Sequence, residues 1–74
     1  MSSQTLLTRR QSEVFHLLAL GLTNAQIAAK LVIAISTVEG HLKNIYRRLG
    51  VDNRTQAVSY GYRHELFTTR RNPQ

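Results

Sequence analysis

The chain is 74 residues long, contains no cysteine, and carries ten Lys or Arg against four Asp or Glu, a formal net charge of +6. This length allows one small domain, and the lack of cysteine excludes disulfide bridges and thiolate zinc sites. The positive charge favours a polyanionic partner, with nucleic acid ahead of an anionic membrane surface.

The two ends of the chain lack the apolar periodicity of the segment between them. We expect residues 1–6 to form a flexible lead and the basic residues 68–74 a disordered tail, on either side of one domain at residues 7–67. No stretch approaches the ~20 consecutive apolar residues of a membrane span. The first residues also lack the basic region and apolar run of a signal peptide. We therefore expect no membrane partner and a cytoplasmic bacterial setting.

The first helix begins after Thr8, because Thr8 and Gln11 have the spacing of a capping box, which satisfies backbone donors at a helix start. Gly21 is a natural left-handed stop at its end. The residues predicted to face inward share helical spacing and are Val14, Phe15, Leu17 and Leu18.

A second capping box, Thr23 with Gln26, opens the next helix. Its inward residues are Ile27, Ala28 and Leu31. Residues 32–35 are all apolar, which predicts a short turn buried between two helices.

The third helix is predicted to begin at Ile35 or Ser36, with Ser36 and Glu39 as a further capping box. It ends at Leu49, before the left-handed residue Gly50. An apolar stripe at i, i+4, i+7 and i+11 comprises Val38, Leu42, Ile45 and Leu49. The opposite side carries Ser36, Gly40, Lys43, Asn44 and Arg47. A short helix that positions a longer one with a basic outer face is the helix-turn-helix arrangement that reads DNA.

A fourth helix is capped by Asn53 and runs to about Leu66. The chain shows no strand-like alternation and no internal repeat, so the fold class is predicted as all-α, a compact four-helix domain containing a helix-turn-helix. The fourth helix also presents small residues that allow a second copy to approach closely. The predicted dimer surface is Ala57, Val58, Gly61 and Tyr62.

No enzyme is predicted. The chain shows no nucleophile with a paired base, no carboxylate pair in a plausible cleft and no glycine-rich phosphate loop. We therefore expect no catalytic residue and no cofactor. The three histidines, His16, His41 and His64, are too dispersed to indicate a metal site.

Four blocks, LTRRQSEVF, TNAQIAAKL, STVEGHLKNIYRRLGV and NRTQAV, resemble the LuxR-type (FixJ or GerE) helix-turn-helix domain in order and spacing. The resemblance covers Leu7 to about Leu66, and residues 32–58 look most like the maltose-regulator-type branch. It implies a four-helix domain that binds DNA through its third helix, usually as a dimer. Such domains are often the output module of a receiver or ligand-binding protein.

Three departures from the family pattern matter. Glu39 and Gly40 stand where many members carry a basic and a bulkier residue, so the target sequence does not carry over from relatives. Gln11 stands where the family usually has glutamate, so an ion pair with Arg54 would be lost. Ala34 replaces a common serine cap, which shifts the capping duty to Ser36. Arg54 resembles a near-constant arginine that more often braces the fold than touches DNA.

The resemblance also implies that Glu39, Gly40 and Lys43 face base edges. Lys43 can donate to guanine O6 and N7, with a phosphate contact or a solvated lysine as the alternatives. Glu39 can accept from cytosine N4, although capping through Ser36 is the more ordinary use and the one we favour. Gly40 costs ~1 kcal/mol in mid-helix relative to alanine. The glycine at position 40 is explained either by a close approach of DNA to the helix or by weak selection at that position.

Phosphate contacts are predicted where small polar side chains sit at helix N-termini, with simple capping as the compatible alternative. Two residues on the outer face of the third helix join this group. The set is Thr23, Asn24, Ser36, Thr37, Asn44 and Arg47.

The sequence thus predicts specific binding of double-stranded DNA by the effector domain of a bacterial transcription regulator, with the third helix in the major groove. The expected partners are DNA and a weak homodimer mate. RNA polymerase and a covalently attached sensor domain are further candidates. The alternative is a helical protein-interaction module that binds an acidic partner, which the scarcity of exposed apolar anchors around Lys43 disfavours.

Overall fold

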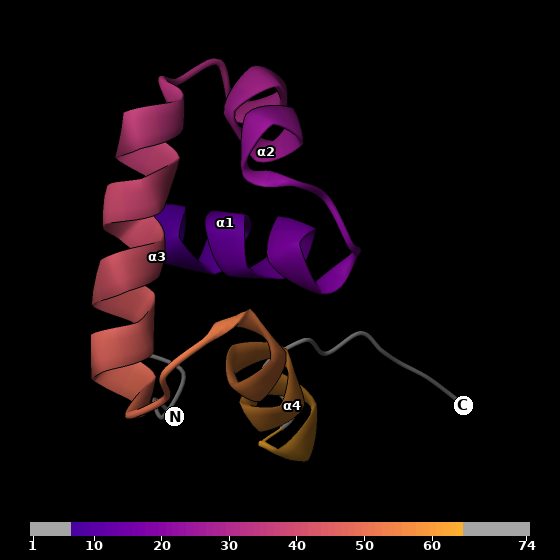
Figure 1. Cartoon of the computed structure of the whole chain (residues 1–74), viewed down its shortest axis with the longest axis vertical. Helices are drawn as coiled ribbons and strands as arrows, with labels where there is room; N and C mark the ends of the chain where they lie inside the picture. The colour runs from indigo at the N-terminus through magenta and orange to yellow at the C-terminus, as the bar shows by residue number, and fades with distance from the viewer. Residues whose placement is uncertain (1–6, 65–74) are drawn as a thin grey trace.

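Residues 7–64 of the chain fold into four α-helices joined by short connections. A computed structural model describes residues 7–64, so the predicted lead at residues 1–6 and the predicted tail at residues 68–74 lie outside the described part. The helices are α1 (Arg9–Ala19), α2 (Asn24–Leu31), α3 (Ile35–Leu49) and α4 (Arg54–Arg63). Helix α3 runs along one side of the molecule, with α1 against its middle and α2 and α4 towards its two ends (Figure 1). The predicted all-α, four-helix architecture is confirmed.

Three of the four helices begin at the capping residues predicted from the sequence. The Thr8 hydroxyl accepts from the Gln11 N–H at 3.1 Å, and the Gln11 side chain accepts from the Thr8 N–H at 3.0 Å. Thr23 and Gln26 repeat this exchange at 3.1 and 2.8 Å. The Asn53 side chain accepts from the Gln56 N–H at 2.9 Å. These bonds satisfy backbone donors that a helix leaves unpaired in its first turn.

The ends of α3 and α4 differ in how well the sequence located them. Gly50 takes the expected left-handed conformation with φ 71°, and the following Val51 N–H donates to the Tyr46 carbonyl at 3.0 Å. Helix α4 ends at Arg63, earlier than the predicted end near Leu66. His64 leaves the helix with φ −103° and ψ 11°, and its ring stacks on that of Tyr60 four residues before, with the ring centroids 4.1 Å apart.

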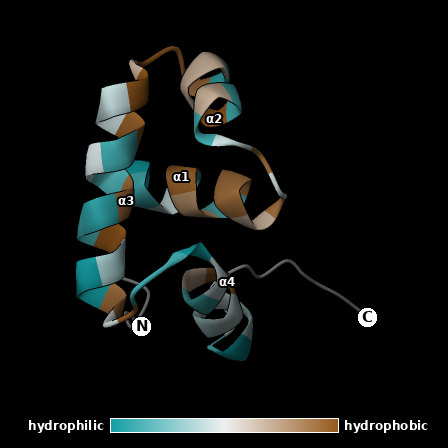
Figure 2. Ribbon diagram, viewed as in Figure 1, coloured by the Kyte–Doolittle hydropathy of each residue, from teal (hydrophilic) through white to brown (hydrophobic). Residues whose placement is uncertain are grey.

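The hydrophobic core lies where α1, α2 and α4 meet the inner side of α3. All four residues of the predicted α3 stripe are buried, and Figure 2 shows the hydrophobic side of α3 turned towards α1. The buried apolar residues are Val14, Phe15, Leu18, Ile27, Ala28, Val38, Leu42, Ile45, Leu49 and Ala57. Burying such side chains stabilises by roughly 1.5–3 kcal/mol each, so this core fixes the orientation of α3.

The turn between α2 and α3 lies on the surface, and the prediction that it is buried was wrong. Val32 is 87% exposed and Ile35 is 46% exposed, whereas Ile33 alone of the three packs against the core. The chain reverses through Val32, which caps α2 in the left-handed conformation with φ 58°. That reversal directs the Val32 side chain outward, and the brown connection at the top of Figure 2 marks this exposed apolar turn.

Candidate nucleic-acid interface

Helix α3 presents one continuous polar side to solvent. The side opposite the buried stripe carries Ser36, Thr37, Glu39, Gly40, Lys43, Asn44 and Arg47. All of these residues are exposed, and we refer to them as the outer face of α3. The face is held rigidly because its helix contributes four residues to the core on the other side. The structure therefore brings together all the base-contact residues and four of the phosphate-contact residues expected from the sequence.

The start of α3 carries no side-chain cap, so the predicted Ser36–Glu39 capping box was wrong. The helix begins at Ile35 and Ala34 is its N-cap, which places Ser36 inside the first turn rather than ahead of it. The Thr37 N–H donates to the Ala34 carbonyl at 3.0 Å. Within residues 7–64, the N–H groups of Ile35 and Ser36 have no hydrogen-bond partner. Unpaired donors at a helix start, together with the helix dipole, favour binding of an anion.

Glu39 and Lys43 lie one helical turn apart on the outer face, and neither is engaged within the described part of the chain. The single ion pair found among residues 7–64 joins Arg10 and Glu13 at 3.1 Å on α1. Glu39 makes no hydrogen bond or ion pair there, although Glu followed by Lys at i, i+4 is a favourable order for pairing. Both charged groups are therefore available to a ligand.

Arg54 braces the start of α2 against the start of α4. Its guanidinium donates to the Leu22 carbonyl at 3.1 Å and to Asn24 Oδ1 at 2.8 Å. This agrees with the structural role that the family resemblance implied, and neither bond involves Gln11. The Asn24 amide oxygen accepts this bond, and its NH₂ group, the side-chain donor that a phosphate contact needs, stays available.

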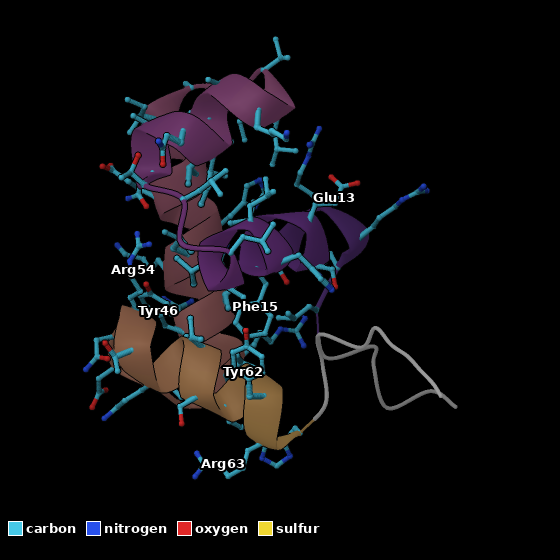
Figure 3. All side chains as sticks on the ribbon, turned by 90° about the vertical axis from the view of Figure 1, so that its right-hand side faces the viewer. Glu13, Phe15, Tyr46, Arg54, Tyr62 and Arg63 are labelled. Atoms are coloured by element: carbon cyan, nitrogen blue, oxygen red, sulfur yellow. The ribbon has the colours of Figure 1, made fainter. Side chains whose placement is uncertain are left out.

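An open groove joins the outer face of α3 to this brace. It is lined by Asn24, Glu39, Leu42, Lys43, Tyr46 and Arg54. Figure 3 shows Tyr46 and Arg54 together at one edge of the molecule, above α4. Sequence reasoning missed the contribution of Tyr46, although its spacing of seven residues from Glu39 places both on the same side of a helix.

Thr23 forms its capping box and still has one donor that the box does not use, its hydroxyl hydrogen. Its hydroxyl oxygen accepts from Gln26 and its N–H donates to Gln26. The hydroxyl hydrogen can still donate, so capping and a phosphate contact remain compatible at this residue.

The predicted dimer surface on α4 is only partly accessible. Ala57 is fully buried in the domain's own core and Gly61 is also buried, so neither residue can meet a second copy. Val58 is half-buried and Tyr62 is 62% exposed. The available part of this surface is therefore reduced to Val58 and Tyr62.

Residues 7–64 contain neither a membrane-spanning helix nor a metal-binding cluster. None of the four helices is both long and apolar enough to cross a membrane. Within the same residues, no group of three or more His, Asp or Glu side chains is placed to hold a metal ion.

The model of the bacterial regulatory proteins of the luxR family matches residues 5–61. The chain belongs to this family. Among its relatives is the response regulator protein VraR of Staphylococcus aureus, 44% identical over 62 residues, which cover 84% of this chain and 30% of VraR. The VraR proteins of Staphylococcus saprophyticus and Staphylococcus epidermidis match to the same extent.

A solved structure, that of the response regulator ChrA in a heme-sensing two-component system, has the same fold. It is 46% identical, with a TM-score of 0.79, over 82% of this chain and 30% of ChrA. The chain thus spans about a third of the length of these relatives. The domain is a luxR-family helix-turn-helix, and its class of function is DNA-binding transcription regulation. The comparisons give no support to the maltose-regulator-type branch.

Proposed function

We propose that this domain binds double-stranded DNA sequence-specifically as the effector of a bacterial, cytoplasmic transcription regulator, with α3 in the major groove. The observation that carries the proposal is the outer face of α3, a rigid, exposed and polar surface beside an uncapped helix start. The major groove is about 12 Å wide, which admits one α-helix. The net charge of +6 supplies the long-range attraction to phosphates.

Phosphate contacts would fix the position of α3 in the groove. The unpaired N–H groups of Ile35 and Ser36 can donate to a phosphate oxygen. The hydroxyl, side-chain amide and guanidinium groups that can join them are on Thr23, Asn24, Ser36, Thr37, Asn44 and Arg47. Contacts of this kind set register and orientation but carry no sequence information.

Base contacts would come from the centre of the outer face. Lys43 is exposed, carries no ion pair within the described residues, and can donate to guanine O6 and N7. Glu39 and Gly40 flank it on the same face. A partner protein would need apolar anchors in the middle of its contact surface. The outer face has none, which disfavours the alternative of a module for acidic protein partners.

The proposal includes a weak homodimer formed on DNA through α4. The accessible residues Val58 and Tyr62 offer a small contact area, and small interfaces associate weakly. Two half-sites about one helical turn apart would hold both copies at high local concentration. A covalently attached sensor domain is a further proposed partner, because the matched response regulators are about three times longer. RNA polymerase is another candidate.

Selection of bound duplexes from a random pool tests the proposal. We expect a consensus to emerge and affinity to fall steeply with added salt, since counterions are released from neutralised phosphates. A polyaspartate competitor distinguishes the alternative function. Recovery of no consensus, with polyaspartate displacing duplex DNA at equal charge, would contradict specific DNA binding and favour an acidic protein partner.

A further inference from the structure

The outer face of α3 holds one acidic side chain, Glu39, in a position where a negative charge repels DNA unless it has a specific use. Its expected use within the protein was to cap α3, and the structure removes that use because Ala34 is the N-cap and no side chain caps the helix. Within residues 7–64, neither of the nearby cations forms an ion pair with Glu39. Lys43 forms no ion pair with it, and Arg54 donates instead to Leu22 and Asn24.

The position next to Glu39 is equally unexplained by the fold. Gly40 lies in the interior of α3, where glycine is less favourable than alanine. A Cβ atom added there would meet no atom within 4 Å, so packing inside the domain does not require glycine. The missing side chain leaves the helix backbone open at the centre of the outer face. A ligand can therefore approach the α3 backbone more closely at Gly40 than at its neighbours.

We propose that Glu39 selects a cytosine in the target DNA and that Gly40 is the positioning residue that lets α3 approach closely enough for this contact. The proposal rests on the proposed binding of α3 in the major groove. There the cytosine N4 amino group donates to the Glu39 carboxylate. Guanine presents only the acceptors N7 and O6, and thymine presents O4, so both repel a carboxylate. Adenine places the acceptor N7 beside its one donor, which also disfavours it.

Lys43 extends this inference to the composition of the half-site. It stands one turn of α3 after Glu39 and lines the same groove. Its preferred base contacts are O6 and N7 of guanine. This guanine is either the pairing partner of the cytosine that faces Glu39 or part of an adjacent base pair. The target half-site is therefore expected to contain a G·C pair, or two adjacent ones, with cytosine facing Glu39 and guanine facing Lys43.

The test is parallel site selection with the wild-type chain and with Glu39→Gln and Glu39→Ala. Wild type should select cytosine at one position. Glu39→Gln should change that position towards adenine, because a side-chain amide pairs with adenine N6 and N7. Glu39→Ala should lose the preference there, from about tenfold to within about twofold, and keep the rest of the consensus. Glu13→Gln removes an equal charge from α1, away from the outer face, and should leave the consensus unchanged.

Two other measurements distinguish a role of Glu39 and Gly40 in DNA recognition from a role in stabilising the fold. Glu39→Ala should melt no lower than wild type, since the side chain is exposed and alanine favours a helix. Gly40→Ala should raise the melting temperature and yet weaken binding to the selected site several-fold. The inference is overturned if Glu39→Gln and Glu39→Ala keep the wild-type consensus, or if Gly40→Ala binds as tightly as wild type. If wild type itself selects no consensus, the proposed function fails together with the inference.

Discussion

Lys43 and Arg47 are both exposed cations on the outer face of α3, one turn apart, yet we assign them different contacts. Lys43→Ala should cost ~1–3 kcal/mol at the selected site and relax the preference at one base pair, because a base contact is lost. Arg47→Ala should weaken binding to all sequences about equally and flatten the salt dependence by about one unit of slope. Gel-shift titrations on selected and random duplexes measure both effects. Equal losses on the two duplexes for Lys43→Ala would show that it contacts phosphate.

Val32 stores backbone strain that a single substitution should release. A β-branched residue is a genuine outlier at φ 58°, and the left-handed region costs roughly 1–2 kcal/mol for residues with a Cβ. The side chain is 87% exposed, so little burial is lost when it is removed. Val32→Gly should therefore raise the free energy of unfolding by up to about 1 kcal/mol, after the greater chain entropy of glycine is offset.

Thermal or urea unfolding of Val32→Gly and Val32→Ala provides the measurement for this strain. Alanine keeps the Cβ and should gain less than glycine. A Val32→Gly protein that unfolds at lower denaturant than wild type would mean that the turn relies on the valine side chain.

The residue scale is also where sequence reasoning failed most clearly. Ser36 and Glu39 have the spacing of a capping box, but spacing does not say which residue precedes the first helical turn. The helix begins at Ile35, two residues too early for Ser36 to cap it. Val32 and Ile35 are apolar and were expected inside, yet the direction of the chain at a left-handed residue decides which way they point.

At the scale of the helix, the packing of α3 against the core positions the candidate DNA interface. Leu42 is 5% exposed and belongs to the core, so Leu42→Ala should destabilise the domain by roughly 2–5 kcal/mol. For a small domain this is a large share of total stability. Leu20→Ala is the matched control, since Leu20 is 74% exposed and should change stability by no more than about 0.5 kcal/mol. Indistinguishable melting curves for the two variants would put the assigned faces of α3 in doubt.

Element types and their starts were predictable here because local signals agreed with the apolar pattern. Thr8, Thr23 and Asn53 each precede a helix and each makes its capping bond. The end of α4 was not predictable, because the residues after Arg63 carry no glycine or proline to mark a stop before position 73. The groove beside α3 depends on the crossing of α2 and α4, which hydrophobic spacing within one helix does not determine.

For the whole molecule, the proposed dimer must use the accessible part of α4. Gly61 is buried, so a charged substitution there would test the fold rather than the dimer. Tyr62 is 62% exposed, and Tyr62→Glu should abolish cooperative filling of paired half-sites while single-site affinity stays within a few-fold. Desolvating an unpaired charge in a small interface costs enough to prevent a weak association.

Gln56→Glu is the matched control for this dimer, because it adds the same charge on another exposed side of α4. Its side-chain oxygen can still accept from the Asp52 N–H, as that of Gln56 does at 2.8 Å. Sedimentation and gel-shift titrations on one and two half-sites provide the readout. Unchanged cooperativity in Tyr62→Glu would place the dimer surface elsewhere or make the domain monomeric on DNA.

The central claim is that the outer face of α3 reads base edges in the major groove, and base analogues test it most directly. In the selected duplex, 7-deazaguanine removes the major-groove acceptor N7, whereas inosine removes only the minor-groove amino group of guanine. We predict that 7-deazaguanine facing Lys43 lowers affinity about tenfold and that inosine at the same position changes it by no more than about twofold. A loss of affinity with inosine and none with 7-deazaguanine would contradict the account.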